Sequence, residues 1–322
     1  MTDDPQLPEQ KDKSRRTEAE WTFSFEQLEQ FGESVAGWLN QLGIGADADL
    51  QHTTLSEPLG ACEQARVRLD LTVGRAMIGA LPEDSPNLIE IDVVSIGAVE
   101  MTASTENSTK SVRLRQKRTS GGDFFKPVKD AVDVVARNNE LKWVVRLSPR
   151  VALTLDVDAS LTVDQFDLTG LKLKQFKMDG STGHTVVRFP AQPFTANIEG
   201  GVGVLDLHIP DTAKTTLNLD AGAGATNLFI GAAGVKATIE GGVGNCTIHV
   251  PADAALRVRA DSGLGNIVVP ETSRSVEFES EFISESGLWE TEGFEFAPEK
   301  IDIRYEGGVG SLIVQATPPS EG

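Results

Sequence analysis

Apolar and polar residues alternate along most of the chain after residue 66, and this period of two predicts β-strands. Residues 194–198 place Phe, Ala and Ile at every second position, and residues 205–209 do the same with Leu, Leu and Ile. Successive strand residues point to opposite faces of a sheet, so each of these segments buries one face only. We therefore expect an all-β fold for this part of the chain.

A short motif, an acidic residue followed by a glycine-rich turn, recurs between the strands. Its copies are Asp179-Gly-Ser-Thr-Gly183, Glu199-Gly-Gly-Val-Gly203, Asp220-Ala-Gly-Ala-Gly224, Glu240-Gly-Gly-Val-Gly244 and Asp261-Ser-Gly-Leu-Gly265. They begin 20, 21, 20 and 21 residues apart. A sixth copy, Glu306-Gly-Gly-Val-Gly310, follows an insertion, while Asp158-Ala-Ser-Leu-Thr162 and Asp70-Leu-Thr-Val-Gly74 resemble degraded earlier copies.

Two short strands joined by a glycine turn cannot bury an apolar face alone, so each repeat must stack on its neighbours. The repeat therefore predicts a β-solenoid, or a closely related stacked-strand rack, built from 20/21-residue coils. We expect a structural turn at each copy, where positive φ costs least for glycine. These turn glycines are Gly183, Gly203, Gly224, Gly244, Gly265 and Gly310.

The N-terminal part has a different pattern. Residues 1–20 are polar and are expected to form a disordered tail, because they cannot bury enough apolar surface to offset the ordering entropy. Residues 21–43 predict one amphipathic helix, capped at Ser24 and ended by Gly43. Its apolar stripe is Leu28, Phe31, Val35, Trp38 and Leu42. We expect it to cap the β domain, with docking to a partner as the alternative.

Residues 44–66 are expected to be a connector, and residues 67–317 a β-repeat domain with two excursions. One excursion, at 271–300, holds nine Glu against Arg274 and Lys300 and is expected to be a strand-rich hairpin over the last coils. The other spans residues 104–140. It carries basic residues at Lys110, Arg113, Arg115, Lys117 and Arg118. Contact between these oppositely charged excursions is a further hypothesis.

Several longer segments resemble one protein family. They are the repeated Ile-Glu-Gly-Gly-Val-Gly units, Leu141-Lys-Trp-Val-Val-Arg-Leu-Ser-Pro149, Leu153-Thr-Leu-Asp-Val157, Phe166-Asp-Leu-Thr-Gly-Leu-Lys-Leu173 and Ile301-Asp-Ile-Arg-Tyr-Glu-Gly-Gly-Val-Gly310. Over residues 67–317 the chain resembles bacterial toast-rack proteins, also called putative-adhesin or β-strand-repeat proteins of unknown function. It is also similar to the C-terminal domain of cell-wall-active-antibiotic response proteins. The resemblance implies the stacked-strand fold and supplies no catalytic motif.

The repeated acids form the strongest candidate for chemistry. Stacked coils would place Asp179, Glu199, Asp220, Glu240 and Asp261 in a column with a spacing of about 5 Å. Such a column could bind a row of calcium ions or line a polysaccharide-cleaving groove. The alternative, which we favour, is a set of solvated turn acids that accept local backbone hydrogen bonds.

Other reactive side chains are few. His208 and His249 occupy equivalent repeat positions on the outer side of the strands, while His52 and His184 stand alone. They could bind a metal, but surface strand positions are the interpretation we favour. Cys62 and Cys246 lack the spacing of a zinc or redox pair, so we expect two buried reduced thiols. We predict no catalytic residue and no cofactor.

Net charge and hydropathy limit the classes of partner and the cellular location that the sequence allows. The formal net charge is −19, from 48 acidic and 29 basic residues, which disfavours nucleic acid and anionic lipid as partners. The sequence has neither a signal-peptide pattern nor an apolar stretch long enough to span a membrane, which predicts a cytoplasmic protein. We expect a non-enzymatic scaffold that binds a protein partner or self-associates. The alternatives are an envelope-stress signalling module and, less favoured, a carbohydrate-active β-helix enzyme; no small-molecule ligand can be identified.

Overall fold

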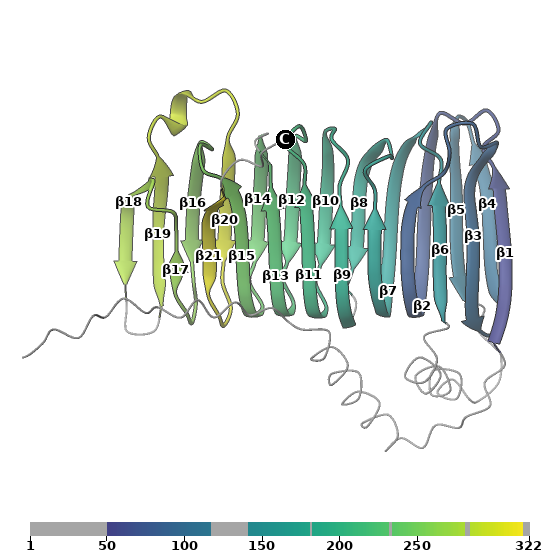
Figure 1. The fold of residues 1–322 in the computed structure, drawn as a ribbon, viewed down its shortest axis with the longest axis horizontal. Coiled ribbons are helices and arrows are strands. Elements are labelled where there is room, and N and C mark those ends of the chain that lie inside the picture. Colours follow the sequence, from purple (N-terminus) through teal and green to yellow (C-terminus); the bar gives the residue numbers. More distant parts are fainter. Residues whose placement is uncertain (1–49, 117–140, 181, 232–233, 281–283, 318–322) are drawn as a thin grey trace, which may run out of the picture.

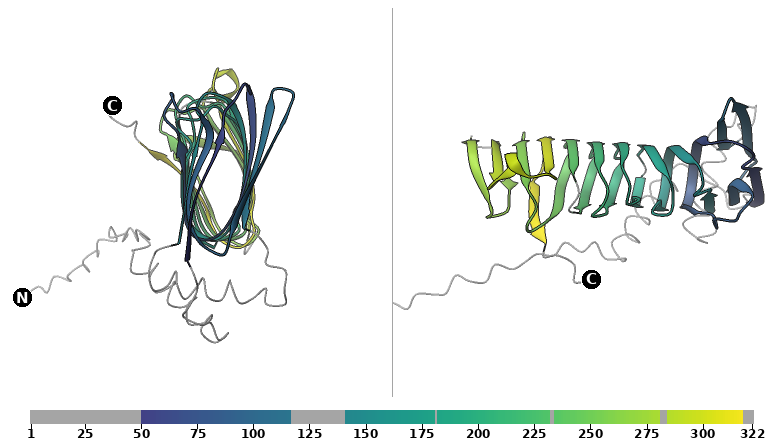
Figure 2. Two further views of the ribbon diagram at one scale, coloured as in Figure 1. Left: turned by 90° about the vertical axis from the view of Figure 1, so that its right-hand side faces the viewer. Right: turned by 90° about the horizontal axis from the view of Figure 1, so that it is seen from above.

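Two opposed walls of β-strands enclose a narrow apolar interior in the computed structural model, which describes residues 50–116, 141–180, 182–231, 234–280 and 284–317 (Figures 1 and 2). The N-terminal strands are β1 (Leu50–Pro58), β2 (Gln64–Ala80), β3 (Asn87–Ile96), β4 (Val99–Glu106), β5 (Thr109–Gln116), β6 (Lys142–Leu147) and β7 (Ala152–Asp167). The central strands are β8 (Leu173–Asp179), β9 (Thr182–Arg188), β10 (Phe194–Glu199), β11 (Val202–Ile209), β12 (Thr215–Asp220), β13 (Ala223–Ile230), β14 (Val235–Glu240) and β15 (Val243–Pro251). The C-terminal elements are β16 (Leu256–Asp261), β17 (Ile267–Val268), β18 (Ser273–Ser280), β19 (Glu285–Thr291), the 3₁₀ turn η1 (Phe294–Phe296), β20 (Ile301–Glu306) and β21 (Leu312–Thr317).

The hydrogen-bond ladders assign these strands to two faces. Face A runs β4, β5, the first half of β2, the first half of β7, β8, β10, β12, β14, β20, β16, β19 and β18. Face B runs β1, β3, β6, the second halves of β2 and β7, β9, β11, β13, β15, β21 and β17. Each coil contributes one strand to each face, and β2 and β7 are long enough to supply both. The all-β, stacked-strand prediction is confirmed.

Coils stack in parallel and in register, so equivalent repeat positions lie side by side. On face A, Ala196 pairs with Leu217, which pairs with Ala237, and all three side chains are buried. On face B, Leu207 pairs with Leu228, which pairs with Ile248, and these are buried as well. The period-two pattern thus directs one side of every strand into a continuous core, which burial of apolar area stabilises.

The turn glycines also form a column. The φ angles of Gly183, Gly203, Gly224, Gly244, Gly265 and Gly310 lie between 131° and 152°. A Cβ built on Gly203 would lie 1.9 Å from the carbonyl oxygen of Gly183, and one on Gly244 would lie 1.8 Å from that of Gly224. Glycine is therefore required both by the backbone conformation and by the close approach of neighbouring coils.

The spatial order of the coils differs from their order in the chain. Strands β20 and β21, which come last, lie between the β14–β15 coil and the β16–β17 coil (Figure 1). Glu306 consequently lies between Glu240 and Asp261. Treating the sixth repeat as the last in space would be wrong, because β16 pairs with β20 and not with β14.

The two ends of the solenoid are built differently. At the N-terminal end, the antiparallel strands β1, β3 and β4 extend the faces. There the buried Lys110 Nζ on β5 donates to Glu57 Oε1 on β1 and to the Pro58 carbonyl, each at 2.6 Å, and so bridges the faces. At the C-terminal end, the β18–β19 hairpin extends face A by two strands, while face B stops at the two-residue β17.

Two expected boundaries and one expected contact need correction. The expected connector 44–66 contains β1, whose core-facing side carries Gln51, Thr53, Leu55 and Glu57 and so lacks a clear apolar alternation. The expected excursion 104–140 contains β5, which pairs with β2 as part of the rack. The two charged excursions lie at opposite ends of the rack and do not meet within the described residues. The expected tail and helix, residues 1–43, lie outside the described part of the chain.

Candidate functional site

Eight carboxylates line one edge of the outer surface of face A. Their strand register gives the spatial order Asp70, Asp158, Asp179, Glu199, Asp220, Glu240, Glu306 and Asp261. Neighbouring strands of a sheet are about 4.8 Å apart. All five acids of the sequence-derived column are therefore in one row, joined by Asp70 and Asp158 from the degraded repeats and by Glu306.

Cations neutralise parts of this carboxylate column. Asp70 accepts hydrogen bonds from Arg113 Nη2 at 2.7 Å and from Arg68 Nε at 3.1 Å. Partial burial works to raise the pKa of Asp70, but these arginine hydrogen bonds outweigh it and hold the pKa below its usual value. Lys177 pairs with Asp179 at 2.9 Å, and Arg304 pairs with Glu306.

The acids in the middle of the column have no ion pair with any cation in the described ranges. Glu199, Asp220 and Glu240 follow Asn197, Asn218 and Thr238 at the position where β2, β8, β16 and β20 carry Lys or Arg. Asp220 Oδ1 accepts the Gly222 N–H at 3.0 Å, as expected of a turn acid. Asp261 Oδ1 does the same with the Gly263 N–H at 3.1 Å. The central carboxylates therefore form an unneutralised acidic segment at the outer surface.

No cluster of three or more His, Cys, Asp or Glu side chains converges into a metal-binding geometry among the residues that the structure places. The parallel register explains this, because it sets the carboxylates in a straight row rather than around a common point. Cation binding along the column stays a prediction.

A column of rings lies on the outer side of face B. Phe229 pairs with His208 on one side and with His249 on the other. The ring centroids are 4.5 Å and 4.4 Å apart, and the interplanar angles are 4° and 10°. Sequence reasoning found both histidines but missed Phe229, although it occupies the same repeat position.

The surroundings of His208 and His249 lower the pKa of both side chains and so favour their neutral form. Partial burial is the main factor that lowers the pKa of His208, and nearby Arg188 lowers it further, while Asp206 opposes the change. Partial burial and the neighbouring His208 lower the pKa of His249. Because Phe229 separates the two imidazoles, this column does not form a two-histidine metal site.

The two thiols differ in their surroundings. Cys246 is buried in the core, and burial raises the pKa of its thiol to about 12, which leaves it without nucleophilic thiolate. Cys62 is only half-buried, so the expectation of two buried thiols is wrong for it. Its position in the short link between β1 and β2 leaves its side chain partly at the surface. Its Sγ lies 3.1 Å from the Leu59 carbonyl oxygen.

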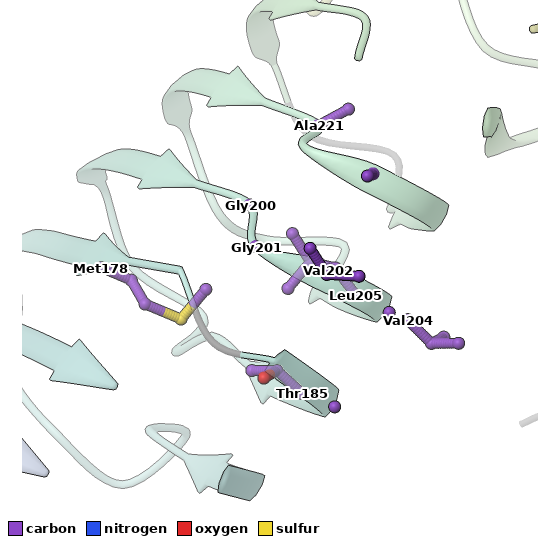
Figure 3. Close-up of a pocket in the computed structure, with 11 residues that line it drawn as sticks. Met178, Thr185, Gly200, Gly201, Val202, Val204, Leu205 and Ala221 are labelled. Atoms are coloured by element: carbon purple, nitrogen blue, oxygen red, sulfur yellow. The ribbon is translucent and has the colours of Figure 1, made fainter. Parts of the chain in front are cut away.

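The surface of the described residues includes the following two hollows. One lies at the glycine turns around Gly200 and Gly203 and offers about 10 Å³, room for no more than a water molecule (Figure 3). The other, about 580 Å³, lies beside β16, β19 and β18. Its lining includes Arg259, Arg304, Asp261, Glu277, Phe278 and Leu288. The larger hollow is thus part of the C-terminal end of the rack.

This C-terminal end exposes apolar side chains beside an unpaired strand edge. β18 pairs with β19 alone among the described strands, and it lies at the end of face A (Figure 1). Phe278 and Val276 on β18 are 52% and 56% exposed, and Val268 on β17 is 50% exposed. Val268 is on the outer side of face B, whereas Phe278 is exposed because none of the described strands of face B lies opposite the hairpin.

Comparison with known proteins supports the fold assignment. The family described as the N-terminal domain of toast_rack, DUF2154, matches residues 46–208. The sequence matches no curated protein. No helix in the described ranges is both long and apolar enough to cross a membrane.

The chain is also similar to solved structures. One is a putative cell adhesion protein from Clostridium sporogenes, with 14% identity, 84% of this chain and 100% of that chain covered, and a TM-score of 0.41. Another is a putative adhesin from Bacteroides fragilis, with 10% identity, 85% and 100% covered, and a TM-score of 0.36. Because the family match spans half of the chain and includes its first repeats, the protein belongs to the toast-rack family.

Proposed function

We propose that the protein is a non-enzymatic scaffold that binds another protein through the outer surface of its rack. The observation that carries this proposal is the in-register stacking of coils, which turns single outer residues into straight columns on two long faces. Such columns give a regular surface on which equivalent side chains repeat at a fixed spacing of about 4.8 Å. The central acids and the ring column are the most distinctive parts of it.

The internal contacts support a rigid, preorganised surface. Asn218 Nδ2 donates to Asn197 Oδ1 at 2.8 Å on face A, and Asn227 Nδ2 donates to Asp206 Oδ1 at 2.8 Å on face B. These bonds link neighbouring coils through side chains that also face solvent. A surface already ordered before binding loses less entropy when a partner docks.

Photo-crosslinking in the cells that make the protein tests this function. A photoreactive residue replaces Asn218 on face A, Gln315 on face B or Phe278 at the C-terminal edge, one position per variant; buried Val258 is the matched control. We expect a discrete adduct with another protein, or with a second copy, from at least one exposed position and none from position 258. An absence of adducts at all three exposed positions would contradict the proposal.

A further inference from the structure

The free edge of β18 is open to strand addition. β18 spans eight residues, and its second edge has no paired strand in the described chain. An unpaired edge presents a row of backbone N–H and C=O groups that can pair with an added strand. On face B the terminal strand β17 has two residues, too few to offer a comparable edge.

The side chains of β18 alternate in chemistry. Glu277 and Glu279 pair in register with Leu288 and Ser286, which face the outer side together with Arg259 and Asp261. Neither glutamate has an ion pair or a side-chain hydrogen bond with any residue that the structure places. The outward side of β18 therefore carries two glutamates without ion pairs, while Arg274, nearer the start of the strand, lies in register with Glu290.

Phe278 points the opposite way, toward the core side. It pairs through Gly287 with the buried Ala260, and its ring centroid lies 5.9 Å from that of Trp289. It remains 52% exposed because face B ends before reaching it. An added strand would bring a side chain next to this exposed ring on the core side.

Charge argues against a second copy as the occupant. Pairing β18 with another β18 brings two acidic hairpins together, and these repel. The edge strands of the other end, β1 and β4, contain Glu57, Glu100 and Glu106 and no lysine or arginine. Arg113 and Arg115 on the adjacent β5 are already paired with Asp70 and Glu100. Glu57 and Glu100 are themselves paired with Lys110 and Arg115, so β1, β4 and β5 of a second copy present no unpaired lysine or arginine to the glutamates of β18.

We propose that β18 binds an extended basic segment of a partner protein, which adds to face A as a further strand. The partner strand carries lysine or arginine at alternate positions, opposite Glu277 and Glu279, and an apolar residue beside Phe278. Cross-strand pairs of opposite charge and of apolar side chains both stabilise such pairing. This inference rests on the proposed function and names the chemistry of the partner.

Fluorescence anisotropy with the full chain tests the proposal. The probe is a labelled peptide, Lys-Thr-Lys-Val-Lys-Thr-Lys, and its all-glutamate analogue Glu-Thr-Glu-Val-Glu-Thr-Glu is the control. We expect the lysine peptide alone to bind. The double variant Glu277→Lys/Glu279→Lys should weaken binding about tenfold or more. The matched variant Glu271→Lys/Glu292→Lys, which changes two exposed acids outside β18, should leave binding unchanged.

Two further measurements separate strand addition from simple charge attraction. N-methylation of alternate peptide amides should abolish binding for one of the two possible sets, because only one set faces β18. Amide hydrogen exchange of residues 273–280 should slow on binding. No binding, binding unaffected by the Glu277→Lys/Glu279→Lys change, or equal binding of both N-methylated peptides would overturn the proposal. Crosslinks from positions 218 or 315 would still support the scaffold function in that event.

Discussion

Glu240 and Glu306 lie side by side in register on β14 and β20, although a complete coil and a hairpin separate them in the chain. This pairing places the C-terminal strands inside the rack and leaves β16, β17 and the β18–β19 hairpin at its end. The location of the exposed β18 edge follows directly from it. The same pairing brings Glu306, with its partner Arg304, next to the unneutralised part of the carboxylate column.

Replacing Gly203 by alanine should destabilise the rack strongly. The new Cβ would meet the Gly183 carbonyl oxygen at 1.9 Å, and the φ of 138° is unfavourable for alanine. We expect a loss of about 2–4 kcal/mol in the free energy of unfolding, measured by urea denaturation. Gly79→Ala is the control, because its Cβ would have its nearest neighbour at 4.0 Å. Equal stability of the two variants would contradict the close-approach argument.

The Lys110–Glu57 bridge should stabilise the N-terminal end more than a surface ion pair does. Lys110 is buried and also donates to the Pro58 carbonyl, so Lys110→Met leaves two acceptors without their donor. We expect a cost of about 1–3 kcal/mol in chemical denaturation. Arg115→Met removes the exposed pair with Glu100 and should cost less than about 1 kcal/mol. A larger cost for Arg115→Met would refute this ranking.

Acid should weaken the fold through His208 and His249. Their pKa values are lowered in the folded protein, so the unfolded chain binds more protons near pH 6. The stabilisation is fully present above the unfolded pKa of about 6.5 and is lost as the pH falls toward the folded values. The double variant His208→Gln/His249→Gln should flatten this part of the curve of melting temperature against pH. An unchanged slope between pH 7 and pH 5 would count against the prediction.

Removing one central carboxylate should relieve repulsion in the column. Glu240→Gln is expected to stabilise the protein by up to about 0.5 kcal/mol at low ionic strength, and the gain should vanish near 1 M salt. Glu306→Gln is the comparison, because Glu306 is already paired with Arg304 and should give no gain. Thermal melts with and without calcium extend the test. Calcium that binds the column would stabilise the parent protein more than Glu240→Gln, and a Glu240→Gln variant less stable at every salt concentration would contradict the repulsion.

The sequence pattern predicted the structure of a single coil but not which coils lie next to each other in space. Glycine, acid and alternating apolar residues mark where each strand turns and which side it buries, since these depend on local chemistry. The order of coils depends on which strand edges meet, and the equivalent residues Leu256 and Ile301 present the same kind of buried apolar side chain to the interior. The copy that begins at Glu306 therefore gave no signal that it lies before the one at Asp261 in space.

The sequence pattern also failed to predict three other features, for similar reasons. The sequence pattern did not predict β1 because this edge strand turns the polar side chains of Thr53 and Glu57 toward the core, so its residues do not alternate clearly between apolar and polar. Predicting the ring column from the sequence requires aligning Phe229 with His208 and His249 at one repeat position, although their side chains differ in chemistry. The alternation of Glu277, Phe278 and Glu279 is visible in the sequence. The exposure of the β18 edge is not, because it depends on where face B ends.

The exposed edge of β18 and the order of acids at the C-terminal end of the carboxylate column depend on the placement of β20 and β21 between β14–β15 and β16–β17. Engineered disulfides test it most directly, in a chain whose own thiols are replaced by Cys62→Ser and Cys246→Val. Thr238 and Arg304 pair in register, within the Cα separation that a disulfide needs, whereas Thr238 and Arg259 are two strands apart. The Thr238→Cys/Arg304→Cys chain should form the disulfide on mild oxidation and the Thr238→Cys/Arg259→Cys chain should not. The reverse result would contradict the strand order and, with it, the exposed edge of β18.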